Sequence, residues 1–83
     1  MWFVYVLKSE KSGVRYIGMT EHVENRLIQH NSGKSRFTKG HMPWVLVYSE
    51  EVGSSVDARK REKYLKSGLG RQFLDAKVIR NYD

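Results

Sequence analysis

Two tyrosines, an arginine, a histidine and a glutamate are spaced along this chain so that they could act on one phosphate group. Tyr5 and Tyr16 lie in two apolar segments near the start, Arg26 and His30 follow, and Glu62 comes later. A guanidinium matches phosphate geometry, and a carboxylate with phosphate oxygens and waters suits Mg²⁺. Tyrosine, whose ordinary pKa is about 10, can take up a proton if a neighbouring cation or a metal-bound hydroxide lowers the barrier. These residue types predict metal-assisted hydrolysis of a phosphodiester.

Within that chemistry we expect Tyr16 to be the general base, or less favourably a nucleophile. Arg26 would bind the phosphate, and Glu62 would be the protein ligand of one Mg²⁺ or Mn²⁺ ion. Tyr5 would support the site, and His30 would relay a proton or bind the phosphate.

Each of these residues also has a simpler structural interpretation. The tyrosines would pack in strands, Arg26 would be solvated on a basic helix, and His30 would sit at the edge of the core. Glu62 would pair with Arg26, or with the lysine four residues later. Their occurrence together behind two tyrosine-bearing strands favours the catalytic interpretation.

The segments that must position these residues predict an α+β fold. Residues 2–7 and 14–19 read as a β-hairpin, and residues 44–48 as a third strand. A first helix begins near Thr20 as its N-cap and ends at Asn31-Ser32-Gly33. We expect one domain, residues 1–83, with a three-stranded, mainly antiparallel sheet and helices packed around it in the order ββαβαα.

Residues 34–43 read as a basic loop, and a second helix follows the third strand. Ser54 with Asp57 three residues later resembles a capping box at its start. That helix is expected to run to about Lys66, with Gly68 and Gly70 ending it and a short terminal helix beginning near Gly70.

Two polar residues fall on helix faces that should be apolar. On a helical wheel His30 shares the face of Val23 and Leu27, and Glu62 interrupts the stripe of Ala58 and Leu65. Burying an unpaired carboxylate is unfavourable, so Glu62 needs a cation, a metal or good hydrogen-bond donors.

The order and spacing of these residues resemble the GIY-YIG nuclease domain, from Trp2 to about Leu74. The resemblance implies single-metal phosphodiester hydrolysis, as in homing endonucleases, restriction enzymes and a repair nuclease subunit. It implies that the tyrosines lie on neighbouring strands, the arginine and histidine on the first helix, and the metal-binding glutamate on a later one. The matching positions are Tyr5, Tyr16, Gly18, Arg26, His30, Asn31 and Glu62.

The chain departs from the family pattern at two positions. Phe3 stands where the first motif has glycine. Met19 follows the second motif, where several relatives carry a lysine whose charge could activate the tyrosine. We therefore expect compensation by Lys34 or Arg15, a larger role for His30, or weak activity.

The formal net charge of +6 indicates a polyanionic partner, with nucleic acid first and DNA before RNA. An anionic membrane surface is the second choice. Ser35 and Thr38 could donate hydrogen bonds to phosphate, and Phe37 could stack on a base or join the core. The basic residues expected to contact the backbone without reading sequence are Lys34, Arg36, Lys39, Lys63 and Lys66.

Other functional classes are excluded or remain as alternatives. The chain has no cysteine, which excludes disulfides and a thiolate zinc site. No apolar run is long enough for a membrane span, so a cytoplasmic protein is expected. The alternatives to an enzyme are a non-catalytic nucleic-acid-binding module of the same fold, or a subunit of a homodimer or larger complex. Trp2 and Trp44 would be the first places to look for an interface.

Overall fold

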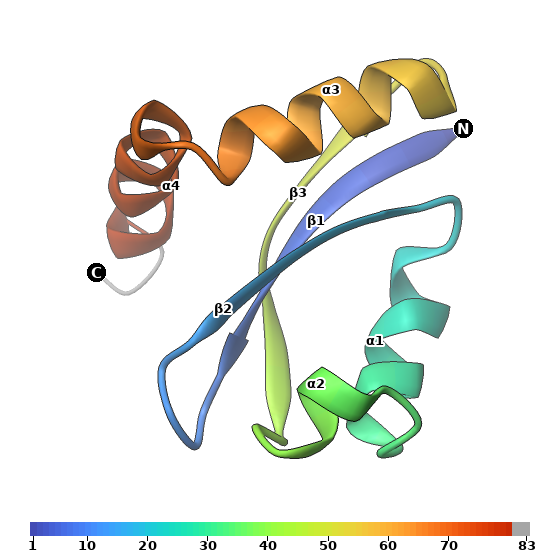
Figure 1. Cartoon of the computed structure of the whole chain (residues 1–83), viewed down its shortest axis with the longest axis vertical. Helices are drawn as coiled ribbons and strands as arrows, with labels where there is room; N and C mark the ends of the chain where they lie inside the picture. The colour runs from blue at the N-terminus through green and yellow to red at the C-terminus, as the bar shows by residue number, and fades with distance from the viewer. Residues whose placement is uncertain (81–83) are drawn as a thin grey trace.

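A three-stranded antiparallel sheet with two pairs of helices forms the fold of this chain, seen here in a computed structural model that describes residues 1–80 (Figure 1). The strand order is β2-β1-β3, so the first strand is central and pairs with both others. The elements are β1 Trp2–Ser9, β2 Arg15–Thr20, α1 Val23–Asn31, α2 Arg36–Lys39, β3 Trp44–Val52, α3 Ser55–Leu65 and α4 Gly68–Arg80. The predicted α+β class and the antiparallel sheet are confirmed.

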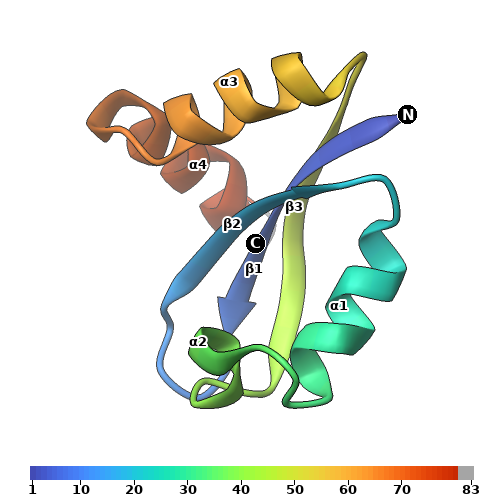
Figure 2. The ribbon, with the colours of Figure 1, turned by 45° about the vertical axis from the view of Figure 1, so that its right-hand side comes forward.

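Both faces of the central strand are buried, which explains its continuous apolar run. Val4 and Val6 pack on one face with residues of α3 and α4. Tyr5 and Leu7 pack on the other face with Trp44 and with residues of α1. Figures 1 and 2 show the α1–α2 pair at the lower part of the molecule and α3 above the sheet. The chemistry-bearing residues of the hairpin therefore lie on the α1–α2 face.

Two expected helix boundaries need correction. α1 begins at Val23 with His22 as N-cap, because Thr20 is still paired in β2. The Thr20 hydroxyl accepts a hydrogen bond from the His22 amide at 3.0 Å, so it contributes to the turn rather than to the cap. The segment expected as a basic loop contains the short helix α2. Ser54 does cap α3, since its Oγ accepts a hydrogen bond from the Asp57 amide at 3.2 Å.

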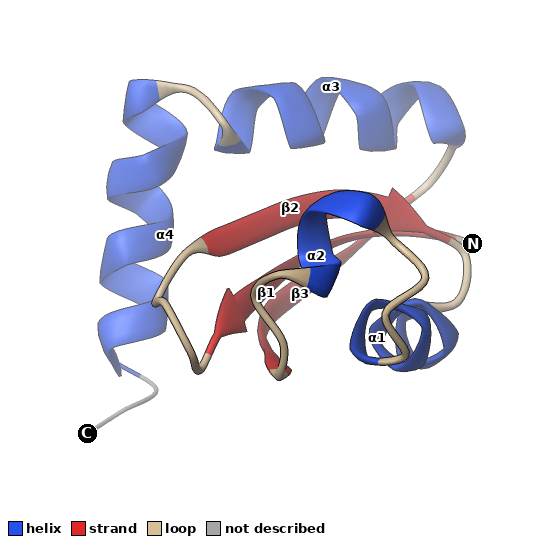
Figure 3. Ribbon diagram, turned by 60° about the horizontal axis from the view of Figure 1, so that its bottom comes forward, coloured by secondary structure: helices blue, strands red, loops and turns tan. Residues whose placement is uncertain are grey.

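The prediction that Gly68 and Gly70 end the second long helix was wrong, because both lie in α4. α3 ends at Leu65, with Lys66 as C-cap. A Cβ atom at Gly70 would overlap the backbone of Tyr64 and Leu65, so glycine lets the two helices meet closely. Figure 3 shows α3 running alongside β2 and α4 running across the direction of α3. Residues of both helices pack against Val4 and Val6 of the central strand. None of the helices formed by residues 1–80 has the length and apolar character needed to cross a bilayer.

Candidate active site

Tyr5 and Gly18 face each other across the β1–β2 pair and fit together closely. The two residues are register partners, and a Cβ atom at Gly18 would lie 2.7 Å from the Tyr5 hydroxyl oxygen. No side chain larger than hydrogen fits there without moving the tyrosine ring. Gly18 is therefore a paired strand residue that makes room for Tyr5.

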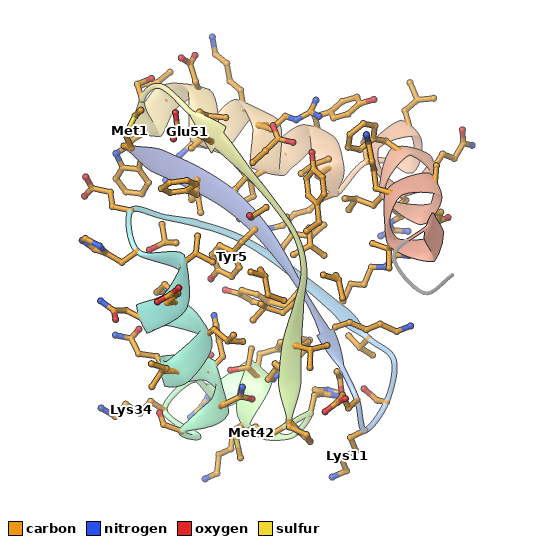
Figure 4. All side chains as sticks on the ribbon, turned by 180° about the vertical axis from the view of Figure 1, so that it is seen from behind. Met1, Tyr5, Lys11, Lys34, Met42 and Glu51 are labelled. Atoms are coloured by element: carbon orange, nitrogen blue, oxygen red, sulfur yellow. The ribbon has the colours of Figure 1, made fainter. Side chains whose placement is uncertain are left out.

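The Tyr5 side chain belongs to a buried chain of hydrogen bonds. Its hydroxyl lies 3.0 Å from His30 Nε2, and His30 Nδ1 lies 3.0 Å from the Thr38 hydroxyl. Trp44 Nε1 donates to the Thr38 carbonyl at 2.8 Å. All four residues are at most 2% exposed. Figure 4 shows the labelled Tyr5 side chain in the interior of the molecule.

The charges around this chain determine its protonation. Burial, and then the neighbouring Arg26 charge, lower the pKa of His30, so the imidazole is neutral near pH 7. Burial raises the pKa of Tyr5, although the adjacent Arg26 guanidinium opposes this rise. Because a guanidinium can only donate, the Tyr5 proton is left for His30 Nε2, and His30 Nδ1–H then donates to Thr38. This arrangement satisfies both ring nitrogens.

Arg26 links the two tyrosines. Its interaction with the Tyr5 hydroxyl is the main cause of its raised pKa, and the Tyr16 phenol adds to the rise. The Tyr16 ring is half-buried, with its centroid 4.7 Å from that of His30 and 6.2 Å from that of Tyr5. Arg26 NH1 also donates to Gln29 Oε1 at 2.7 Å, which steadies the guanidinium. Tyr5, Tyr16, Arg26 and His30, predicted from the sequence, thus form one cluster.

Glu62 lies on α3, outside the ring contacts of the tyrosine cluster. Its negative charge is the smallest of the influences that raise the pKa of Tyr5. The side chain is 20% exposed and pairs with Lys66 Nζ at 3.0 Å, which is one of the ion pairs expected from the sequence. A hollow beside it is lined by Arg59, Glu62, Lys63 and Lys66.

Glu62 fits a divalent cation only as a single protein ligand. Residues 1–80 contain no group of three or more histidine, cysteine or acidic side chains that could hold a metal by themselves. The oxygen of one carboxylate nevertheless suits Mg²⁺ or Mn²⁺, which take their remaining ligands from water and phosphate. The partly exposed carboxylate satisfies that requirement once Lys66 moves aside.

Asn31 fastens the end of α1 to the start of β3. Its side-chain carbonyl accepts from the Trp44 amide at 2.7 Å, and its side-chain NH₂ donates to the Trp44 carbonyl at 3.0 Å. This pair of bonds fixes the helix turn that carries His30. Asn31 is thus the last residue of α1, and Ser32 is its C-cap.

The two departures from the family pattern fall in different surroundings. Met19 packs against the core cluster of Val4 and Val6, on the sheet face opposite Tyr5. A charged side chain at position 19 would thus begin on the face of the sheet opposite Tyr16, so it could not act directly on the Tyr16 hydroxyl. Phe3 pairs with Thr20 at the end of the hairpin. Arg15, one of the expected compensating cations, instead forms a salt bridge with Asp75 at 2.7 Å.

The basic residues lie on two sides of the tyrosine cluster. Lys34 is exposed and lines a hollow with Arg26, Gln29, His30 and Ser35. Arg36 and Lys39 are exposed on α2, and Lys63 and Lys66 are exposed beside Glu62. Thr38 was expected at phosphate, but it is fully buried and bonded to His30. Sequence reasoning missed this role, because no periodic pattern marks a residue in a four-residue helix.

Comparison with known proteins agrees with this geometry. A family model described as the GIY-YIG catalytic domain matches residues 1–74. The UPF0213 protein SH2523 of Staphylococcus haemolyticus is 39% identical over 87% of this chain and 88% of its own length. The UPF0213 protein plu4503 of Photorhabdus laumondii is 35% identical over 94% of this chain and 74% of its own length. The solution NMR structure of the UPF0213 protein BH0048 from Bacillus halodurans, 31% identical, superposes with a TM-score of 0.56 over 94% of this chain and 87% of that one. The chain therefore belongs to the GIY-YIG family of nuclease domains, and within it to the UPF0213 proteins.

Proposed function

We propose that this protein is a Mg²⁺- or Mn²⁺-dependent nuclease that hydrolyses phosphodiester bonds in DNA with low sequence specificity. The observation that carries the proposal is the cluster of Tyr5, Tyr16 and His30, with Arg26 lining the hollow beside His30. Glu62 lies on the neighbouring helix α3. A phosphate-binding cation, a proton acceptor and a metal-binding oxygen are the three groups that the reaction requires.

Each residue has a distinct role in this proposal. Arg26 binds the scissile phosphate and stabilises the negative charge that develops on it. Tyr16, the more exposed phenol, takes the proton of the attacking water. Tyr5 and His30 are positioning residues, because they hold Arg26 and the Tyr16 ring from the buried side. Glu62 would hold one divalent ion, which when bound supplies charge neutralisation at the phosphate and help for the leaving oxygen.

The surface charge supports a nucleic-acid substrate without sequence reading. Lys34, Arg36 and Lys39 form one exposed group and Lys63 and Lys66 another, on either side of the tyrosine cluster. Such lysine and arginine contacts go to phosphates, so binding should weaken steeply with salt. DNA is favoured over RNA as the substrate.

The test is cleavage of labelled single-stranded, duplex and branched DNA at low salt with Mg²⁺ or Mn²⁺ and with a chelator. Wild type is compared with Glu62→Gln and Tyr16→Phe, and with Glu51→Gln as an exposed acidic control on β3. We expect metal-dependent cutting that is lost in the first two variants and kept in the third. Cutting that survives Glu62→Gln would contradict the proposed site.

A second candidate is a non-catalytic binding module, which is favoured by the Glu62–Lys66 ion pair. In that case Glu62 would serve only to hold its lysine. DNA binding that is intact in all variants, with no cutting of any substrate, would support this function instead. A homodimer or larger complex remains a prediction, and light scattering of the purified protein tests it.

A further inference from the structure

An exposed aromatic ring lies beside the tyrosine cluster. Phe37, on α2, is 51% exposed. Its ring centroid is 5.2 Å from that of His41, 6.1 Å from that of Tyr16 and 6.5 Å from that of Trp44. We call these four residues the aromatic platform. Phe37 is thus held on one side by three rings and open to solvent on the other.

The setting of Phe37 differs from that of an ordinary exposed apolar residue. The cations Arg36 and Lys39 flank it on α2, and Lys34 precedes the helix. Among the described residues, none of these three cations forms a salt bridge. Figure 4 shows the labelled Lys34 extending outward from the molecule. An apolar ring surrounded by available positive charge is complementary to a base on a phosphate backbone.

The platform also connects directly to the proposed general base. Tyr16 contacts Phe37 on one side and His30 on the other. A group stacked on the open side of Phe37 therefore lies across the Phe37 ring from Tyr16, the proposed general base. In a nucleic acid, that group would be a base of a nucleotide next to the scissile phosphate.

We propose that Phe37 is a stacking site for an unpaired nucleobase, so that the substrate is single-stranded nucleic acid or an unpaired segment of a branched one. This inference rests on the proposed function and adds the substrate class to it. In a duplex each base face is covered by its neighbours, so only an unpaired base offers its face to Phe37. Stacking on an aromatic ring tolerates any base, in agreement with the low sequence specificity proposed above.

The test measures binding without cleavage, in a Glu62→Gln background with a chelator. Labelled oligothymidylate is compared with a strand of equal length made of abasic residues and with a duplex. The first strand and the abasic strand carry the same phosphate charge, but only the first offers bases for stacking. The variants are Phe37→Ala, Phe37→Leu and Phe37→Trp, with Leu69→Ala as an exposed apolar control on α4.

We expect Phe37→Ala and Phe37→Leu to weaken binding of oligothymidylate by about 10-fold and to leave abasic and duplex binding unchanged. Phe37→Trp should restore the affinity, and Leu69→Ala should have no effect. Equal affinity of wild type for the base-bearing and abasic strands would overturn the inference. So would an equal loss for all three ligands in Phe37→Ala with an unchanged thermal midpoint. Neither result depends on cutting. The binding assay therefore tests the stacking site, and the cleavage assay separately tests the nuclease proposal.

Discussion

Replacing Gly18 by alanine should destabilise the protein through Tyr5. The new methyl carbon would lie 2.7 Å from the Tyr5 hydroxyl oxygen, 2.8 Å from Cζ and 3.0 Å from Cε1. The ring is rigid and is held by its hydrogen bond to His30, so it cannot give way as a flexible side chain would. The ring must tilt, and the bond to His30 must lengthen or break.

The magnitude follows from three contributions. Forcing a methyl group into a packed interior costs about 1–3 kcal/mol, and loss of the Tyr5–His30 hydrogen bond about 1 kcal/mol. Alanine loses less conformational entropy on folding than glycine does, which offsets about 0.5–1 kcal/mol of this cost. The free energy of unfolding of Gly18→Ala should therefore fall by about 2 kcal/mol.

Urea unfolding followed by far-UV circular dichroism gives this free energy. Gly40→Ala is the matched control, because Gly40 has φ −78° and a Cβ atom there would meet nothing within 4 Å. On a Tyr5→Phe background the nearest atom and the hydrogen bond are already absent, so Gly18→Ala should cost about 1 kcal/mol less. A Gly18→Ala protein within about 0.5 kcal/mol of wild type would refute the reasoning. Strict additivity with Tyr5→Phe would also refute it.

Three further predictions concern the rest of the site. Folding lowers the pKa of His30 from its ordinary value of 6.5. As the pH falls below 6.5, the unfolded chain therefore protonates this histidine before the folded protein does, and the folded state loses stability. Wild type should therefore lose more stability than His30→Gln between pH 7.5 and 5.5 in urea unfolding, and parallel losses would contradict this. Asn31→Ala should lower the free energy of unfolding by about 2 kcal/mol, because it removes two hydrogen bonds to the Trp44 backbone. An unchanged urea midpoint would show that these two hydrogen bonds do not stabilise the fold. Mn²⁺ at about ten times its Kd should stabilise wild type by about 1.4 kcal/mol in a thermal-shift assay and Glu62→Gln hardly at all; equal shifts would remove Glu62 from the metal site.

Much of the fold was predictable because local patterns determine it. The aromatic and β-branched run at the start predicts a strand, and the capping pair Ser54 and Asp57 marks the start of α3. The helical wheel placed His30 on the inner face, and the structure buries it to 1% exposure. The short helix α2 was missed because four residues carry no periodicity. The terminal helix was predicted, but its start was placed near Gly70 instead of Gly68, because glycine usually ends helices, whereas Gly70 here serves a close helix contact.

The sequence by itself determined which side chains share a face, because helix and strand periods depend only on position along the chain. It thereby predicted the inward placement of His30 and Glu62. The order and spacing of the tyrosines, the arginine, the histidine and the glutamate carried the resemblance to the GIY-YIG domain. Only the tertiary structure decided which side chains meet, because this depends on strand register and on how distant segments pack. The register sets Gly18 against Tyr5, and the fold of α2 brings Thr38 to His30. The same packing leaves Phe37 open beside Tyr16, which no local pattern could show.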